Sequence, residues 1–246
     1  MSRIAKPSHI SRIGTLKRAG AILALIVVSS ADFSRAAEPI YAVDFTTQKR
    51  GPAAPWLKQH GFEFKLGFES LNPRFENGAL EFSANRPEAG LCGREFPKGK
   101  ELSGVKRARI VWGVRQFPEG ADWDAGVNRF AVGLLISFGD ERLPSGLPLG
   151  IHPAPYFICP FIGAKEPEGK AYLGRYWKQG GRYVCVKVKK AGEPSVTELN
   201  LDHLFKGYFK KMETPSVSAF VFQMNTKDTK GSAAAFVKSI EFLGGE

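Results

Sequence analysis

The sequence predicts an all-β protein, a jelly-roll-type β-sandwich of antiparallel strands with one short helix. Clusters of Gly, Pro, Asn and Asp interrupt residues 37–246 about every 10–20 residues. The runs between these breaks are rich in Val, Ile, Phe and Tyr, which suit a pleated, half-buried surface. Several runs alternate with a period of two, which places their apolar side chains on one face of a strand.

The short apolar runs are the predicted strands. They are residues 40–45, 79–84, 91–96, 105–117, 130–138, 156–162, 182–189, 217–224 and 236–243. Residues 201–210 form the predicted helix, which Asp202 could cap and in which Leu204, Phe205 and Phe209 form an apolar stripe. The Pro- and Gly-rich stretch 142–160 is predicted to be a surface loop, and loops of that length often carry function.

Alternation also assigns faces to the longer strands. The inward sets are predicted to be Ala108, Ile110, Trp112 and Val114; Phe130, Val132, Leu134, Ile136 and Phe138; and Val184, Val186 and Val188. The opposite face of 182–189 carries Tyr183, Cys185 and Lys187. Residues 217–224 are apolar on both faces, which predicts a central strand that is covered on its outer side as well.

Residues 1–36 are predicted to be a cleavable signal peptide. Basic residues precede the apolar run 19–28, and small residues follow it, with cleavage after Ala36 or Ala31. The apolar run is shorter than the about 20 residues that span a bilayer, so we expect no membrane span after cleavage. The remaining chain, 37–246, is predicted to be a single domain with a periplasmic or secreted location.

The leader carries six Lys and Arg residues and one Asp, so the formal charge of +11 falls to +6 for residues 37–246. This mildly basic balance is compatible with a polyanion, and no nucleic-acid partner is expected of an exported chain. The three cysteines, Cys92, Cys159 and Cys185, allow one bridge with three pairings, or none. No CxxC motif is present.

A set of motifs occurs in a characteristic order. They are ALEFSA at 79–84, AGLCGREF at 89–96, IVWGV at 110–114, PEGAD at 118–122, NRFAV at 128–132, SAFVFQMNTKDT at 218–229 and AFVKSIEF at 235–242. The order resembles the exported bacterial family DUF3047, of unknown function, over most of the chain after the leader. The resemblance implies a jelly roll of the galactose-binding type and implies no activity. The family has Trp-Arg-Trp where this chain has Val111-Trp112-Gly113, an acidic residue near Asn128, and a more acidic turn at 225–229.

Basic and aromatic side chains indicate a binding surface. Its candidate residues are Arg107, Arg109, Arg115, Lys187, Trp123, Tyr176 and Trp177. Arginine recognises carboxylates through two hydrogen bonds, and exposed Trp and Tyr stack on sugar faces. The leading hypothesis is a non-catalytic carbohydrate-binding sandwich, with an acidic glycan or another polyanion as ligand. Two alternatives remain open. The aromatic rings could pack back onto the sandwich, and the arginines could form an ordinary solvated strand face.

Two other functions stay open. A polysaccharide lyase would use Arg94 to neutralise a uronate, with His152 and Tyr183 as base and acid. An envelope accessory protein would use a flat sheet surface for protein contacts. Glu119, Asp122 and Asp124 lie on one loop and do not form the separated pair of a glycosidase. No cofactor is expected, and a structural calcium site is the alternative, with Asp44, Asn225 and Asp228 as the available oxygens.

Overall fold

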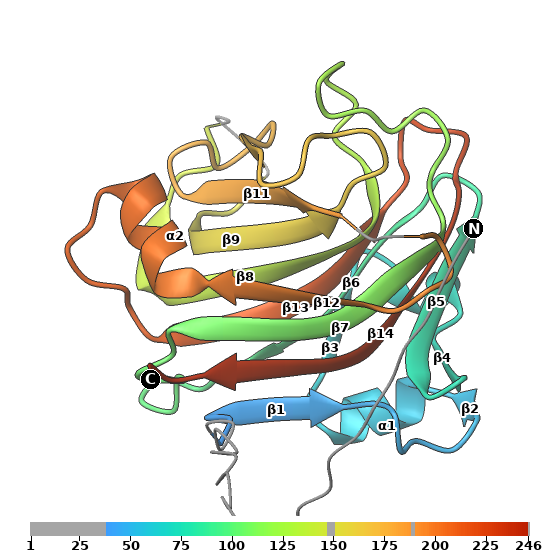
Figure 1. The fold of residues 1–246 in the computed structure, drawn as a ribbon, viewed down its shortest axis with the longest axis horizontal. Helices are drawn as coiled ribbons and strands as arrows, with labels where there is room; N and C mark the ends of the chain where they lie inside the picture. Colours follow the sequence, from blue (N-terminus) through green and yellow to red (C-terminus); the bar gives the residue numbers. More distant parts are fainter. Residues whose placement is uncertain (1–37, 147–150, 188–189, 246) are drawn as a thin grey trace, which may run out of the picture. The chain divides into compact units, whose positions relative to one another are not determined.

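The predicted strands pair into two sheets, as Figure 1 shows for the computed structural model. The structure describes residues 38–146, 151–187 and 190–245, and the predicted signal peptide, 1–36, lies outside them. Within these residues the elements form a jelly-roll-type β-sandwich, as predicted, with two seven-stranded sheets. All strand pairs in the described residues are antiparallel except β9 and β11.

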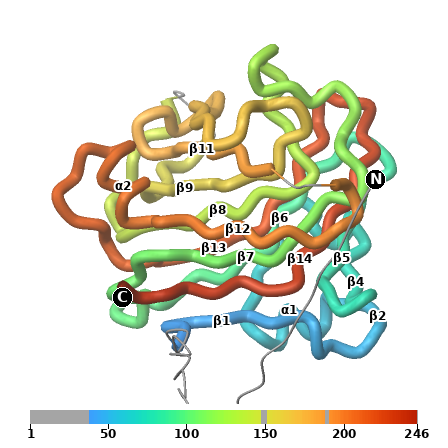
Figure 2. The backbone as a smooth tube through the Cα atoms, in the orientation of Figure 1, coloured from blue at the N-terminus to red at the C-terminus, as the bar shows by residue number. Residues whose placement is uncertain are grey.

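The first sheet, sheet A, has the strand order β12-β7-β14-β5-β4-β2, and β1 also pairs with β14. Its strands are β12 (Ser195–Asn200), β7 (Arg107–Gln116), β14 (Ser232–Leu243), β5 (Ala79–Asn85), β4 (Arg74–Glu76), β2 (Gly51–Pro52) and β1 (Tyr41–Asp44). β12 is therefore an edge strand of sheet A, and it leads directly into helix α2 (Leu201–Phe209), as the tube in Figure 2 shows.

The second sheet, sheet B, has the order β10-β11-β9-β8-β13-β6-β3. Its strands are β10 (Ala171–Tyr172), β11 (Gly181–Val186), β9 (Ala154–Ile162), β8 (Phe130–Leu143), β13 (Val217–Asn225), β6 (Ala89–Glu95) and β3 (Glu63–Lys65). The apolar strand β13 lies between β8 and β6, which confirms its predicted central position. Among the described residues, no helix is long and apolar enough to cross a membrane.

The main core lies between the sheets. It contains the predicted inward set of β7, and Trp112 is fully buried with its Nε1 donating to Thr197 Oγ1 of β12 at 2.9 Å. Val184 and Val186 also belong to this core, whereas Val188 lies outside the described residues. The hydrogen bond between Trp112 and Thr197 ties the edge strand β12 to the core of the sandwich.

The assignment of Phe130 to the inter-sheet core was wrong. The register between β8 and β13 shifts between Gln223 and Asn225, so Phe130 turns to the outer face of sheet B while Ala131 and Val132 face inward. Such a bulge re-aims the side chains beside it. On that outer face a second cluster forms, made of Trp123, Phe130, Phe157, Cys159, Phe161 and Cys185.

Helix α2 matches the predicted segment, but its cap is Asn200 and not Asp202. The Asn200 side chain accepts a hydrogen bond from His203 N at 2.9 Å. A residue that precedes the first turn can reach these amides, whereas Asp202 already lies within the helix. Sequence analysis also missed the short helices α1 (Ala54–Gln59) and η1 (Phe68–Leu71), as well as strands β2, β3, β4, β10 and β12.

The predicted loop 142–160 is shorter than expected. Strand β8 continues to Leu143 and β9 begins at Ala154, while residues 147–150 lie outside the described part of the chain. Alternate residues of β9 pack on opposite faces of sheet B, with Ile158 in the main core and Phe157 in the outer cluster. Because both faces of β9 are covered, its residues do not alternate between apolar and polar, which is why alternation does not mark where the strand begins.

Asp202 joins α2 to Lys106, just before β7, through an ion pair at 2.9 Å, and it also pairs with Lys206 of its own helix at 2.8 Å. Hydrogen bonds from these two ammonium groups hold the pKa of Asp202 well below its usual range. The folded pKa therefore lies below the unfolded value of about 3.9, so this stabilisation is complete above that pH and is lost as the pH falls through the folded pKa.

Asp202→Asn is expected to lower the free energy of unfolding by about 1 kcal/mol at neutral pH, since the pair is partly exposed. The difference from wild type should shrink toward about pH 2. Urea unfolding of wild type and variant at neutral pH and at about pH 2 measures this difference in the free energy of unfolding. A difference that is equal at both pH values would contradict the ionic explanation.

The three cysteines are free thiols and all are buried. Cys92 lies in the inter-sheet core, whereas Cys159 and Cys185 lie in the outer cluster. In the pairing of β9 with β11, Cys159 is opposite Tyr183, so Cys185 is two residues further along. Burial raises the pKa of all three thiols, that of Cys185 to about 11. The sequence left open one disulfide bridge or none, and the structure has no bridge among these three cysteines.

Candidate ligand-binding groove

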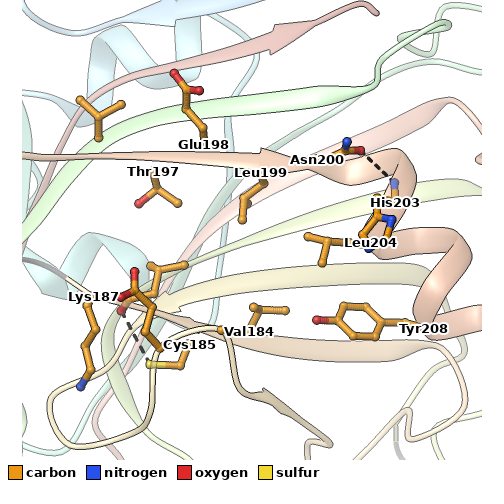
Figure 3. Close-up of a pocket in the computed structure, with 14 residues that line it drawn as sticks. Val184, Cys185, Lys187, Thr197, Glu198, Leu199, Asn200, His203, Leu204 and Tyr208 are labelled. Atoms are coloured by element: carbon orange, nitrogen blue, oxygen red, sulfur yellow. Dashed lines mark hydrogen bonds between the residues drawn. The ribbon is translucent and has the colours of Figure 1, made fainter.

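A groove of about 350 Å³ opens between β12, the edge strand of sheet A, and β11, the second strand of sheet B (Figure 3). Its walls are β12 from sheet A and β11 from sheet B, with α2 at one end and residues 168–169 beside β11. Such volumes lie at the lower end of the range for small-molecule sites, about 300–1,000 Å³. We call this feature the groove.

The floor of the groove is apolar. Val184 and Val186 face it from β11, Leu199 from β12, and Leu204 from α2. The ring of Tyr208 lies at the α2 end, as Figure 3 shows. Burial raises the pKa of Tyr208 above its usual range. Its phenol is protonated at neutral pH, as tyrosine normally is, and is able to donate a hydrogen bond.

Polar groups line the groove as well. They are Glu168, Lys187, Thr197, Asn200 and His203. The Asn200 oxygen caps α2, so its amide NH₂ remains as a donor toward a ligand. Lys187 Nζ donates to the carbonyl oxygens of Gly163 and Ala164 at 3.3 and 3.1 Å, which holds it at the opposite end from Tyr208.

Glu198 lies on β12 but turns away from the groove. Figure 3 shows its side chain on the side of the strand opposite Thr197 and Leu199. Its carboxylate pairs with Arg109 Nε at 3.5 Å, on the outer face of sheet A. Glu168 therefore has no second carboxylate facing it across the groove from this strand, and β12 does not supply the pair that glycoside hydrolysis requires.

A second cavity, of about 240 Å³, lies on the other side of β12. It is lined by Arg107, Ala108, Arg109, Glu198, Leu199, Asn200 and Leu243. Three of the predicted binding residues thus lie beside β12, with Arg107 and Arg109 at this cavity and Lys187 in the groove. The proximity of these three residues to one strand was not predicted, because β12 was not recognised in the sequence.

The predicted basic surface of sheet A is neutralised by glutamates. Arg109 is opposite both Glu198 and Glu241 in the strand register and lies within 3.8 Å of each carboxylate. Arg115 pairs with Glu81 at 2.5 Å and covers the ring of Phe236 at 4.7 Å. The arginines face outward as predicted. The expectation of a basic surface was wrong at these two arginines, because β12 and β14 place acids opposite Arg109, and Glu81 reaches Arg115 from β5, two strands away.

The predicted aromatic residues lie apart from the groove. Trp123 is 5% exposed and packs on Phe161 and Tyr183, with ring centroids 4.8 Å away in each case. Its assignment as an exposed stacking residue was therefore wrong, because the loop folds back onto sheet B. Tyr176 and Trp177 are half-buried at the margin of the outer cluster.

The structure does not assemble the candidate lyase residues. Arg94 is opposite the core residue Phe220, so it lies on the inner face of sheet B, where it donates to His60 O at 2.9 Å. Tyr183 belongs to the outer cluster, four strands away in the sheet order, a separation of about 19 Å. His152 lies near Trp177, whose Nε1 donates to the His152 carbonyl.

The three oxygen donors considered for calcium make local contacts. Asp44 accepts from Thr46 N at 2.7 Å and Asn225 accepts from Lys227 N at 3.2 Å, so both form Asx-type turns. Asp228 pairs with Arg129. In the described part of the chain, no group of three or more His, Cys, Asp or Glu residues is placed to hold a metal ion.

No family model and no curated protein matches the chain. Solved structures similar to it include the xyloglucanase domain of NopAA, a type three effector from Sinorhizobium fredii in complex with cellobiose, at a TM-score of 0.42 and 9% identity over 74% of this chain and 94% of that one. A family 12 xyloglucanase from Bacillus licheniformis has a TM-score of 0.41 at 9% identity over 82% and 96%. Endoglucanase 3 of family GH12 from Trichoderma harzianum has a TM-score of 0.37 at 9% identity over 82% and 96%.

Proposed function

We propose that this chain is an exported, non-catalytic β-sandwich that binds carbohydrate in the groove between β11, β12 and α2. The observation that carries the proposal is the composition of the groove, an apolar floor and one aromatic ring bordered by amide, hydroxyl, imidazole and charged groups. A sugar ring has the complementary surface, with C–H groups on its faces and hydroxyl groups at its edges. Export is predicted from the leader at residues 1–36.

The size of the groove favours one or two sugar rings over a small ion. The position of Tyr208 at the α2 end suits stacking, because its ring is apolar and its hydroxyl is polar. The amide of Asn200 and the ammonium of Lys187 are donors for sugar hydroxyls at the two ends. The outward position of Glu198 supports binding over hydrolysis.

Tyr208→Ala is expected to weaken glycan binding about tenfold, because the stacked ring is worth about 1–2 kcal/mol. A glycan microarray identifies the oligosaccharide, and calorimetry measures its affinity for wild type and variant. Tyr208→Phe keeps the ring and should lose at most a few-fold. Leu66→Ala, at an exposed position next to β3 and away from the groove, should bind like wild type.

Two results would contradict the proposal. One is the failure of every glycan on the array to bind a chain that is folded by circular dichroism. The other is binding that survives Tyr208→Ala unchanged, which would place the carbohydrate elsewhere on the molecule.

A further inference from the structure

The positive charge of the chain is concentrated in one segment. Residues 169–192 contain seven Lys and Arg residues and no Asp or Glu. The rest of 37–246 contains 22 basic and 23 acidic residues, a net charge of −1. The whole positive excess outside the predicted leader therefore belongs to these 24 residues. A field this localised indicates an anionic partner more strongly than the net charge of the chain does.

This segment forms β10, the turn that carries Tyr176 and Trp177, and β11. Six of its cations lie in the described residues. Lys190 pairs with Glu193 at 3.0 Å, and we call the other five the cationic strip. They are Lys170, Arg175, Lys178, Arg182 and Lys187. Lys170 pairs with Asp124 at 2.5 Å. Of the described carboxylates, none lies within 4.0 Å of the charged nitrogens of the other four.

The strip differs in this respect from the arginines of sheet A. Arg109 has carboxylate partners on the neighbouring strands, and Arg115 has one on β5, two strands away, so the charge of both is already satisfied. Arg182 instead donates to main-chain carbonyl oxygens at 2.8 Å, and Lys187 also contacts only carbonyl oxygens. A carbonyl orients a cation and leaves its net charge available to a ligand.

Aromatic rings lie beside two cations of the strip. The Arg175 guanidinium is 5.5 Å from the ring of Tyr176, and that of Arg182 is 5.4 Å from the ring of Phe209. Stacking of this kind fixes the plane of a guanidinium, and a fixed plane favours two-point contact with a carboxylate. Trp177 adds a half-buried ring in the same turn.

The strip is continuous with the groove. Lys187 lines the groove itself. Arg182 lies on the same face of β11 as Val184 and Val186 by alternation, and its position over Phe209 places it against α2, beside the Tyr208 end. A polymer that leaves the groove at either end therefore meets a cation.

We propose that the ligand of the groove is an acidic polysaccharide, with one sugar unit in the groove and the carboxylates of neighbouring units on the cationic strip. This inference rests on the proposed function and names the class of its ligand. Because the sequence predicts export, an acidic glycan is the polyanion that the chain would meet. Single-stranded nucleic acid is the competing polyanion for the experiment.

The experiment compares binding of oligogalacturonate with binding of the same oligomer after methyl esterification, which removes the charge and keeps the sugar backbone. Alginate and hyaluronate oligomers serve as further acidic probes. The test variant is Arg175→Gln combined with Lys178→Gln. The matched control is Lys98→Gln combined with Lys100→Gln, which removes the same charge from an exposed loop elsewhere. Calorimetry at two salt concentrations measures the affinities.

Wild type is expected to bind at least one acidic oligomer about tenfold more tightly than its neutral form, with an affinity that falls as salt rises. The strip variant should lose about tenfold on the acidic oligomer and nothing on the neutral one, and the control should lose less than twofold. Equal binding of both forms, equal losses in both variants, or tighter binding of a thymidine oligonucleotide would overturn the inference. Binding of neutral glycans alone would overturn it and leave the proposed function standing, whereas no glycan binding at all would overturn both.

Discussion

Replacing Trp112 with Ala is expected to lower the free energy of unfolding by about 3–5 kcal/mol. The indole is fully buried between the sheets and is among the largest side chains of the core. Truncation leaves a cavity and also leaves Thr197 Oγ1, on the edge strand β12, without its indole donor. Denaturant unfolding measures the change, and the fluorescence of Trp56, Trp123 and Trp177 reports it.

Two variants separate the causes. Trp112→Phe fills most of the volume and loses the hydrogen bond, so its cost should fall between wild type and Trp112→Ala. Val111→Ala, one residue along β7 on the outer face, should cost less than about 1 kcal/mol because the side chain is only half-buried. If Trp112→Ala were as stable as Val111→Ala, the two-sheet core described above would be wrong.

Replacing Glu166 with Ala is expected to lower the free energy of unfolding by about 2 kcal/mol. Glu166 is 3% exposed, and its carboxylate accepts from Trp123 N at 3.0 Å and from Lys165 N at 3.1 Å. These bonds join the loop of Trp123 to the loop before β10, over the outer face of sheet B. Removing the acceptor leaves two main-chain donors unsatisfied, which is costly where water is excluded.

Glu168→Ala is the matched control, since Glu168 is exposed and only two residues away. It should change the free energy of unfolding by less than about 0.5 kcal/mol. Glu166→Gln keeps one acceptor oxygen, so it should lower the free energy of unfolding by less than Glu166→Ala does. Equal stability of Glu166→Ala and Glu168→Ala, measured by the same unfolding experiment, would show that the carboxylate does not anchor these loops.

The sequence is sufficient to predict the inward and outward faces of those strands in which alternation is regular. In β7 every second residue is apolar, and the faces follow from the period of two alone. Alternation fails at Phe130, because a bulge shifts the register and reverses the face of the residues before it. A bulge depends on pairing with β13, which lies about 90 residues away, so no local pattern reveals it.

Most of the candidate site was not predicted because its main wall, β12, was not recognised as a strand. Val196, Glu198 and Asn200 alternate with Thr197 and Leu199, a pattern that was available in the sequence. The strand runs directly into α2, so no turn residue separates the two elements. The charges of Arg109 and Arg115 were visible in the sequence, but the acids that neutralise them come from strands distant in the chain.

The most direct test of the groove is an amide chemical-shift titration of the folded chain with the oligosaccharide that binds it on the array. We predict that the largest shifts occur at Val184–Lys187, along β12 and in α2 as far as Tyr208, all of which border the groove. Shifts confined to the outer face of sheet A, or to β3 and β6 at the far edge of sheet B, would contradict the account.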